Sequence, residues 1–216
     1  MGRRDVFSKY CVTGKNVRIA VLDSGIDWTH ESLGGPGTLE AYEAAVKSNG
    51  DQLLRSGIFP TDRVVDGYDF LGENFEVTQK SSEAQPDGNP MDGLPGHGTA
   101  VGDAILQVAP DAQLIALKVC VTGGNLCPDF AIAQALEYAL DPNGDNATDD
   151  RVDIINLSLG LPFFSPYVDF ISKMMEQAFH LGAVPIVAMG NSKNIPFVAG
   201  FASIAPNVIS VGSTVN

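Results

Sequence analysis

The chain has 216 residues, of which 44% are hydrophobic and 18% are charged, and this is enough apolar material for one sizeable core. Its 26 acidic and 13 basic residues give a formal net charge of −13, which argues against binding to nucleic acid or to anionic membranes, because both attract basic surfaces. No apolar run approaches the roughly 18 residues that a membrane-spanning helix needs. Residues 1–5 are not followed by the apolar segment of a signal peptide, so we expect either an intracellular protein or a chain that starts after its leader.

Short apolar runs and amphipathic stretches alternate along the chain, which predicts an α/β protein with a parallel sheet covered on both faces. The first run, residues 17–22, is typical of a buried strand, and it stops at Asp23. Residues 34–62 indicate an insertion with one short amphipathic helix, and residues 72–96 predict a long surface loop. The other expected elements are strands at 64–70, 113–119, 152–157, 184–188 and 208–211 and helices at 97–108, 130–140 (with Asp129 as its N-cap) and 168–181.

Three polar residues stand where such elements begin or end. Asp23 follows the first strand, where an Asx turn or a helix cap is the commoner role and a working carboxylate is the alternative. His97 opens a helix between two glycines; it is either a structural histidine or a base that takes a hydroxyl proton near pH 7. Asn191 follows a strand in a small-residue turn. Together they offer the carboxylate, the base and the oxyanion donor that acyl transfer needs.

The order and surroundings of these residues, DSG, then GHGT, then GN, resemble those of subtilisin-like serine proteases, the subtilases, over nearly the whole chain. The resemblance implies a three-layer αβα fold with a mostly parallel sheet, and a serine endopeptidase that hydrolyses polypeptide substrates by an Asp-His-Ser mechanism. It implies that Asp23 orients His97, that His97 is the base, that Asn191 stabilises the oxyanion, and that the chemistry requires no cofactor. The segment from GYDF to GHGT resembles that of subtilases with an inserted protease-associated domain.

The nucleophile of the family lies in a Gly-Thr-Ser-Met-Ala motif, which residues 1–216 do not contain. The resemblance therefore implies the N-terminal part of a subtilase catalytic domain, with its C-terminal third missing from this chain. That missing part would be its partner, and this chain alone would be inactive. The alternative is a serine-less binding or scaffold protein derived from the family. The helix of His97 also departs from the family pattern, because Asp103 replaces a glycine.

The resemblance also implies two walls of a substrate-binding pocket. They are formed by Ser158, Leu159 and Gly160 after one strand and by Ala188, Met189 and Gly190 after another. Small residues on both walls predict a roomy apolar pocket. Ser158 is not expected to be the nucleophile, because it lacks the strained turn of a Gly-x-Ser-x-Gly motif.

The cysteines bear on the cellular compartment. Cys120 and Cys127 flank a short turn, which predicts a disulfide, although two unrelated thiols remain the alternative. A disulfide favours an oxidising compartment and hence a secreted protein. Cys11 is expected to be a small buried hydrophobe.

An acidic segment offers candidate metal ligands. Asp141, Asn143 and Asp145 place oxygen atoms at alternate positions, as calcium loops do, so a structural calcium is one interpretation. The segment lacks the glycine and the glutamate of an EF-hand, and a solvated acidic turn is the favoured interpretation. His30 could be a ligand or a second base, but turn chemistry at the surface is expected for it.

Overall fold

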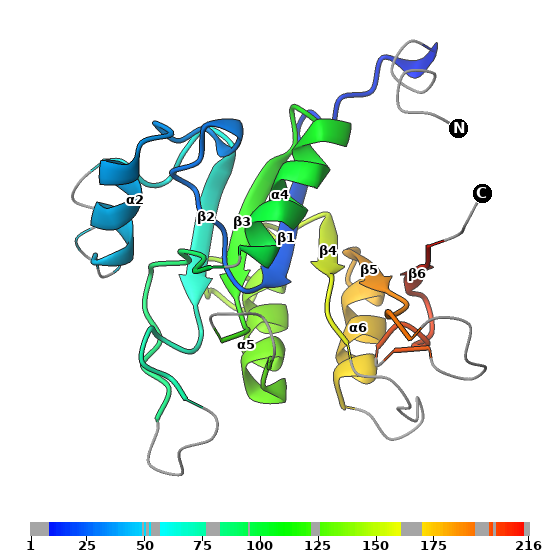
Figure 1. The fold of residues 1–216 in the computed structure, drawn as a ribbon. Coiled ribbons are helices and arrows are strands. Elements are labelled where there is room, and N and C mark those ends of the chain that lie inside the picture. The colour runs from blue at the N-terminus through cyan, green and yellow to red at the C-terminus, as the bar shows by residue number, and fades with distance from the viewer. Residues whose placement is uncertain are drawn as a thin grey trace.

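The structure is a computed structural model that describes residues 9–48, 50, 52, 57–76, 83–94, 96–121, 126–160, 170–192, 199–200 and 202–213. Within these residues a six-stranded parallel sheet has the order β2-β3-β1-β4-β5-β6, and helices cover both of its faces (Figure 1). The predicted αβα architecture with a parallel sheet is therefore confirmed.

The elements agree closely with the expected ones. The strands are β1 (Arg18–Asp23), β2 (Val64–Asp69), β3 (Gln113–Lys118), β4 (Ile154–Leu157), β5 (Val184–Ala188) and β6 (Ile209–Val211). The helices are the short η1 (Glu31–Leu33), α2 (Leu39–Val46), α4 (His97–Val108), α5 (Asp129–Leu140) and α6 (Phe170–His180). Asp129 was expected to cap α5, and this was wrong: Pro128 is the N-cap, and Asp129 lies in the first turn, where its charge still favours the helix dipole.

Strand β1 is central and determines where the site forms. It pairs with β3 on one side and with β4 on the other, and Ala20, Val21 and Leu22 are buried. A parallel strand covered on both faces needs apolar residues at every position, which explains the uninterrupted run at 19–22. The chain turns to one side of β1 for β2 and β3 and to the other side for β4, β5 and β6. In open α/β sheets such a reversal of strand order is where functional residues gather at the carboxyl ends of the strands, and Asp23 is the last residue of β1.

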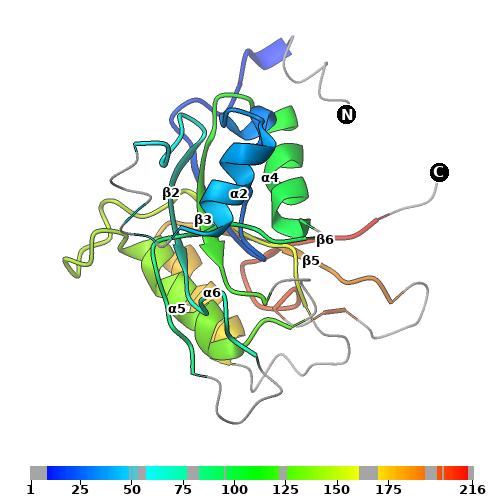
Figure 2. The ribbon, with the colours of Figure 1, turned by 60° about the vertical axis from the view of Figure 1, so that its left-hand side comes forward.

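Two apolar cores lie on opposite faces of the sheet, with α2 and α4 on one side and α5 and α6 on the other (Figure 2). The first core includes Trp28 and Phe59, whose ring centroids are 5.2 Å apart. The second contains the buried faces of α5 and α6, including Ile132 and Met175. Among the described residues, no helix combines the length and hydrophobicity needed to cross a membrane.

Two expectations about exposure do not hold. Cys11 is exposed rather than buried; it lies before β1 in an irregular segment, with φ of 53°. Within the predicted surface loop at 72–96, Asn89 and Met91 are buried. Asn89 donates from its side-chain amide to the carbonyl groups of Ala45 (2.9 Å) and Ser48 (2.8 Å), so this part of the loop is packed against the end of α2.

Candidate active site

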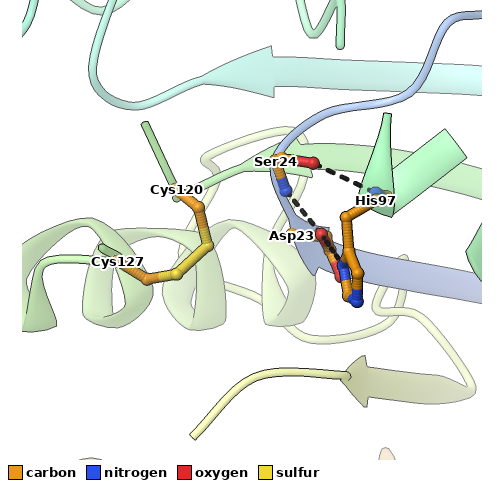
Figure 3. Close-up of a disulfide and its surroundings, with 6 residues drawn as sticks. Asp23, Ser24, His97, Cys120 and Cys127 are labelled. Carbon is orange, nitrogen blue, oxygen red and sulfur yellow. Dashed lines mark hydrogen bonds and ion pairs between the residues drawn. A yellow bond between two sulfur atoms is a disulfide. The ribbon is translucent and has the colours of Figure 1, made fainter. Parts of the chain in front are cut away.

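The carboxylate at the end of β1 and the histidine at the start of α4 meet (Figure 3). Asp23 Oδ1 lies 2.7 Å from His97 Nδ1. The Asp23 side chain is 3% exposed, whereas the imidazole is 53% exposed. Because Nδ1 faces the carboxylate, Nε2 is the ring nitrogen that remains to take a proton from a substrate-side hydroxyl. The predicted pairing of Asp23 with His97 is thus present in the structure.

Neighbouring backbone groups fix the position of Asp23. Ser24 donates its N–H to Asp23 Oδ1 at 2.7 Å. The N–H groups of Val119 and Cys120, just beyond β3, donate to the Asp23 carbonyl at 2.8 and 3.1 Å. Asp23 Oδ2 is buried and has no hydrogen-bond partner among the described residues. The carboxylate is therefore held by the strand end itself and directs one oxygen to the imidazole.

Two glycines allow the helix and the strand end to touch. A Cβ on Gly98 would overlap the carbonyl of Gly25 and lie 3.0 Å from Asp23 Cβ. A Cβ on Gly25, whose φ is 104°, would lie 2.7 Å from the carbonyl oxygen of Pro90. These contacts give the glycines of DSG and HGT a packing role: they bring His97 within reach of Asp23.

The two predicted pocket walls leave adjacent strands. Residues 158–160 follow β4, and the other wall starts at Ala188, the last residue of β5. Leu157 and Val187, the last residues that pair between β4 and β5, lie side by side. Leu157 also pairs with Leu22, so both segments emerge at the same edge of the sheet as Asp23. Ser158 Oγ accepts a hydrogen bond from the Asn156 side chain at 3.0 Å, which ties this hydroxyl to its own strand.

Asn191 lies farther along this edge than the dyad does. It follows β5 on an exposed segment, after Met189 and Gly190, which are also exposed. Gly200 donates its N–H to the Met189 carbonyl at 2.8 Å, and this bond holds the segment near β5. In the described part of the chain, no hydrogen bond links the Asn191 amide to Asp23 or His97. The structure therefore unites two of the three expected catalytic residues directly.

The acidic segment does not have the geometry of a metal site. Asp141 accepts the N–H groups of Asp145 (3.1 Å, Oδ1) and Asn146 (2.8 Å, Oδ2). Asn143 Oδ1 accepts the Asp145 N–H at 2.8 Å, and Asp145 Oδ1 accepts the Ala147 N–H at 2.8 Å. Among the described residues, no three ligating side chains converge. The oxygens thus close turns within their own loop, as in a solvated acidic turn.

The predicted disulfide is confirmed. Cys120 and Cys127 are bonded with a Cα–Cα distance of 4.0 Å (Figure 3). The bond anchors the segment after β3 beside Asp23, because the Cys120 N–H also donates to the Asp23 carbonyl. His30 behaves as expected of a turn residue: its Nδ1 accepts the N–H of Ser32 and caps η1.

A buried ion pair beside the site was not anticipated from the sequence. Lys118, the partner of Asp23 in the β1–β3 register, is only 2% exposed. Its Nζ lies 2.9 Å from Asp69 Oδ2 and 2.9 Å from Glu73 Oε1. Burial acts to lower the pKa of Lys118, but the charges and hydrogen bonds of Asp69 and Glu73 outweigh it, so the pKa is raised and the ammonium stays charged.

Comparison with known proteins identifies the family. The profile of the Subtilase family matches residues 14–216. Minor extracellular protease Vpr of Bacillus subtilis is 28% identical over 209 residues, which cover 94% of this chain and 21% of Vpr. Subtilisin-like protease het-Q2 of Podospora anserina is 34% identical over 148 residues (67% of this chain, 37% of that protein). Subtilisin E of Bacillus subtilis is 27% identical over 212 residues (93% and 42%).

Solved structures agree with this assignment. Sphericase superposes with a TM-score of 0.61 at 25% identity and covers 97% of this chain and 58% of its own. The prenylagaramide maturation protease PagA has a TM-score of 0.58 at 17% identity (100% and 59%) and shows the shared fold alone. The chain belongs to the subtilase family. It spans only 21% of Vpr and 42% of subtilisin E.

Proposed function

We propose that the protein containing this chain is a serine endopeptidase and that residues 1–216 supply the base half of its active site. The observation that carries the proposal is the 2.7 Å contact between His97 Nδ1 and Asp23 Oδ1, made at the carboxyl end of a central parallel strand. A buried carboxylate bonded to an exposed imidazole is the arrangement that activates a hydroxyl nucleophile. Membership of the subtilase family supports the same chemistry.

In the proposed reaction, His97 Nε2 takes the proton of a serine hydroxyl as the oxygen attacks the scissile carbonyl. Asp23 stabilises the resulting imidazolium, and His97 then returns the proton to the leaving amine. Asn191 would donate its amide to the oxyanion that forms on the carbonyl. The serine would come from a C-terminal part of the catalytic domain beyond Asn216, so this chain alone should be hydrolytically silent. The reaction needs no metal or organic cofactor.

The substrate would be a polypeptide bound between the two segments that follow β4 and β5. Neighbouring parallel strands that end side by side support this, because both walls open at the same edge as Asp23. The described end of the sheet supports a C-terminal partner segment. Strand β6 is the edge strand of the described sheet, and its Ile209 and Val211 are both about half exposed. An apolar edge strand of this kind favours packing against a further segment of protein.

We also propose that the protein is secreted. The Cys120–Cys127 disulfide favours an oxidising compartment, and the relative Vpr is described as extracellular. The formal charge of −13 argues against nucleic acid and against an anionic membrane as a partner. A serine-less scaffold protein derived from the same family is the second candidate.

Labelling of the full-length protein with a serine-directed phosphonate separates the two candidates. A peptidase should be labelled and should hydrolyse a peptide ester, and both reactions should be lost in the variants Asp23→Ala and His97→Ala. Residues 1–216 alone should be unlabelled. A full-length protein that is folded, unlabelled and inactive would favour the scaffold. Turnover by residues 1–216 alone that depends on His97 would reveal a nucleophile within this chain.

A further inference from the structure

Asp92 is a second buried carboxylate beside the dyad. Its side chain belongs to a residue that is only 2% exposed, in the loop that leads to α4. Asp92 Oδ2 accepts hydrogen bonds from the Thr99 N–H at 3.0 Å and from the Thr99 hydroxyl at 2.7 Å. Thr99 lies in the first turn of α4, the helix that begins with His97. Asp92 therefore caps the helix that carries the base.

Helix α4 has no capping side chain at its own N-cap position. That position is Gly96, with φ of 77° and no side-chain hydrogen bond. The first N–H groups of a helix need acceptors from elsewhere when the N-cap supplies none. Ser24 Oγ accepts the Gly98 N–H at 3.0 Å, and Asp92 accepts the Thr99 N–H. Both acceptors come from segments around the end of β1, so the cap also joins the helix to Asp23.

Further contacts hold Asp92 in this place. A Cβ on Gly25 would lie 3.0 Å from the backbone nitrogen of Asp92, so the loop crosses directly over the turn that follows Asp23. The Thr99 hydroxyl that donates to Asp92 also accepts the N–H of Asp27 at 2.9 Å. A change at Asp92 would thus act on both the helix and the turn, the two segments whose distance determines the contact between Asp23 and His97.

Asp92 also brings charge to the dyad. Burial raises the pKa of its carboxyl, hydrogen bonds from Thr99 and Ser24 act in the opposite direction, and the negative charge of Asp23 raises the pKa further. The two carboxyls are therefore close enough to interact, and one of them is bonded to His97. A negative charge near an imidazole favours its protonated form.

Among the described residues, the other ionisable groups that interact with Asp92 or with its partner Thr99 are acidic or neutral. Asp27 lies on the turn that contacts Thr99. On α2, the pKa of Tyr42 is raised by burial first, then by the charges of Asp27 and Asp92, with Glu73 adding to them. Within this set of groups, only His97 is basic. A change in the local negative charge should therefore be seen most clearly in the NMR titration of the His97 imidazole.

We propose that Asp92 is a positioning residue for the dyad: it holds the first turn of α4, and with it the imidazole of His97, against Asp23, and its negative charge favours the imidazolium formed during turnover. The proposal rests on the proposed peptidase function for its catalytic consequence. Its two parts, the hydrogen bond to Thr99 and the negative charge, can be distinguished, because the charge can be removed while an oxygen acceptor for Thr99 is kept.

The test uses three variants of the full-length protein. Asp92→Asn keeps an oxygen acceptor for Thr99 but removes the charge, and Asp92→Ala removes both. Asp103→Asn is the matched control, because Asp103 is an acidic residue on the same helix whose carboxylate bonds only to Gln107 (2.6 Å) among the described residues. The readouts are kcat and KM across pH, and the pKa of His97 from NMR titration of its ring protons.

Asp92→Asn should fold with unchanged or higher thermal stability. A carboxyl with a raised pKa contributes stability below its unfolded pKa, and this contribution is lost as pH rises through the folded pKa. At neutral pH the ionised Asp92 therefore lowers the free energy of unfolding. The acid limb of kcat/KM and the NMR titration of His97 should move to lower pH than in wild type. Asp92→Ala should in addition lower kcat by about 10-fold or more with little change in KM.

Two outcomes would overturn the proposal. The first is an unchanged His97 titration in Asp92→Asn, equal to that of Asp103→Asn, because the charge would then not reach the imidazole. The second is an Asp92→Ala variant that loses thermal stability but keeps kcat, because the carboxylate would then be structural only. NMR titration reports on His97 whether or not the protein turns over substrate. A failure of the peptidase assignment is therefore visible separately, as a wild-type protein with no activity and no phosphonate labelling.

Discussion

Replacing Gly98 with alanine should separate His97 from Asp23 without removing any catalytic group. The added Cβ would overlap the Gly25 carbonyl and lie 3.0 Å from Asp23 Cβ, where 3.4–4 Å is an ordinary contact. Neither neighbour can yield easily, because both are parts of the strand end and the turn after it. The start of α4 would have to move away from β1, and the 2.7 Å contact between His97 and Asp23 would lengthen accordingly.

The expected loss follows from this displacement. A shift of about 1 Å would take the Nδ1–Oδ1 contact beyond the range of a hydrogen bond, and misplacement of that size costs about 10²-fold in rate. At 1.36 kcal/mol for each factor of ten, this is about 2.7 kcal/mol of transition-state stabilisation. Overpacking should cost a further 1–3 kcal/mol, roughly, in the free energy of unfolding. The loss should appear in kcat, with KM little changed, because the substrate contacts are not altered.

Gly102→Ala is the matched control, one turn farther along α4. Its Cβ would meet Leu114 Cδ1 at 3.2 Å and Ile26 Cδ1 at 3.3 Å, which are the ends of flexible side chains that can adjust. Alanine also favours a helix interior over glycine by roughly 0.5–1 kcal/mol. We expect near wild-type kcat and stability for this variant, measured on a peptide substrate and by thermal unfolding of the full-length protein. Equal kcat values for Gly98→Ala and wild type would refute the argument that close packing sets the dyad.

Three further changes test other parts of the site. Lys118→Met should destabilise the protein by about 3–5 kcal/mol in denaturant unfolding, because it leaves Asp69 buried and uncompensated, and adding Asp69→Asn should recover part of the loss. Removing the disulfide by Cys120→Ser with Cys127→Ser should cost about 2–3 kcal/mol, whereas an unchanged unfolding midpoint would assign the bond no role in stability. Asn191→Ala should lower kcat by about 10²–10³-fold at nearly constant KM, and an unchanged kcat would place the oxyanion donor elsewhere.

The dyad could be predicted because its signals are local. A buried parallel strand appears in the sequence as a continuous apolar run, and DSG marks where this run ends. The glycine on each side of His97 argues against a packing role for the histidine and so favours a catalytic one. The sheet follows from the same alternation of runs and helices. Asp23 and His97 come together because the carboxyl end of a central strand is where α/β folds form their crevices.

The features that sequence reasoning missed depend on contacts between residues that are far apart in the chain. Lys118 ends a strand, where a lysine is normally exposed, and its burial depends on Asp69 and Glu73 from the far side of β3. Asp92 lies in a stretch of turn-forming residues that indicates a surface loop, yet its packing against Gly25 buries it. A cysteine is usually buried, and Cys11 was misjudged for that reason, because composition alone does not reveal a segment with positive φ.

The contact between Asp23 and His97 forms within the described residues alone, without the serine that the proposed peptidase would need. The contact of Asp23 with His97 depends on bonds from Ser24, on the close approach of Gly98 and on the cap from Asp92, all of which lie between β1 and α4. None of these bonds involves β5 or β6, the side of the sheet at which residues 202–213 end the described part of the chain. A serine delivered within about 3 Å of His97 Nε2 would therefore meet a base already oriented, with no reorganisation of the dyad. The serine therefore distinguishes the two candidate functions: with it the proposed peptidase has a base that is already oriented, and without it the contact between Asp23 and His97 only joins α4 to the end of β1.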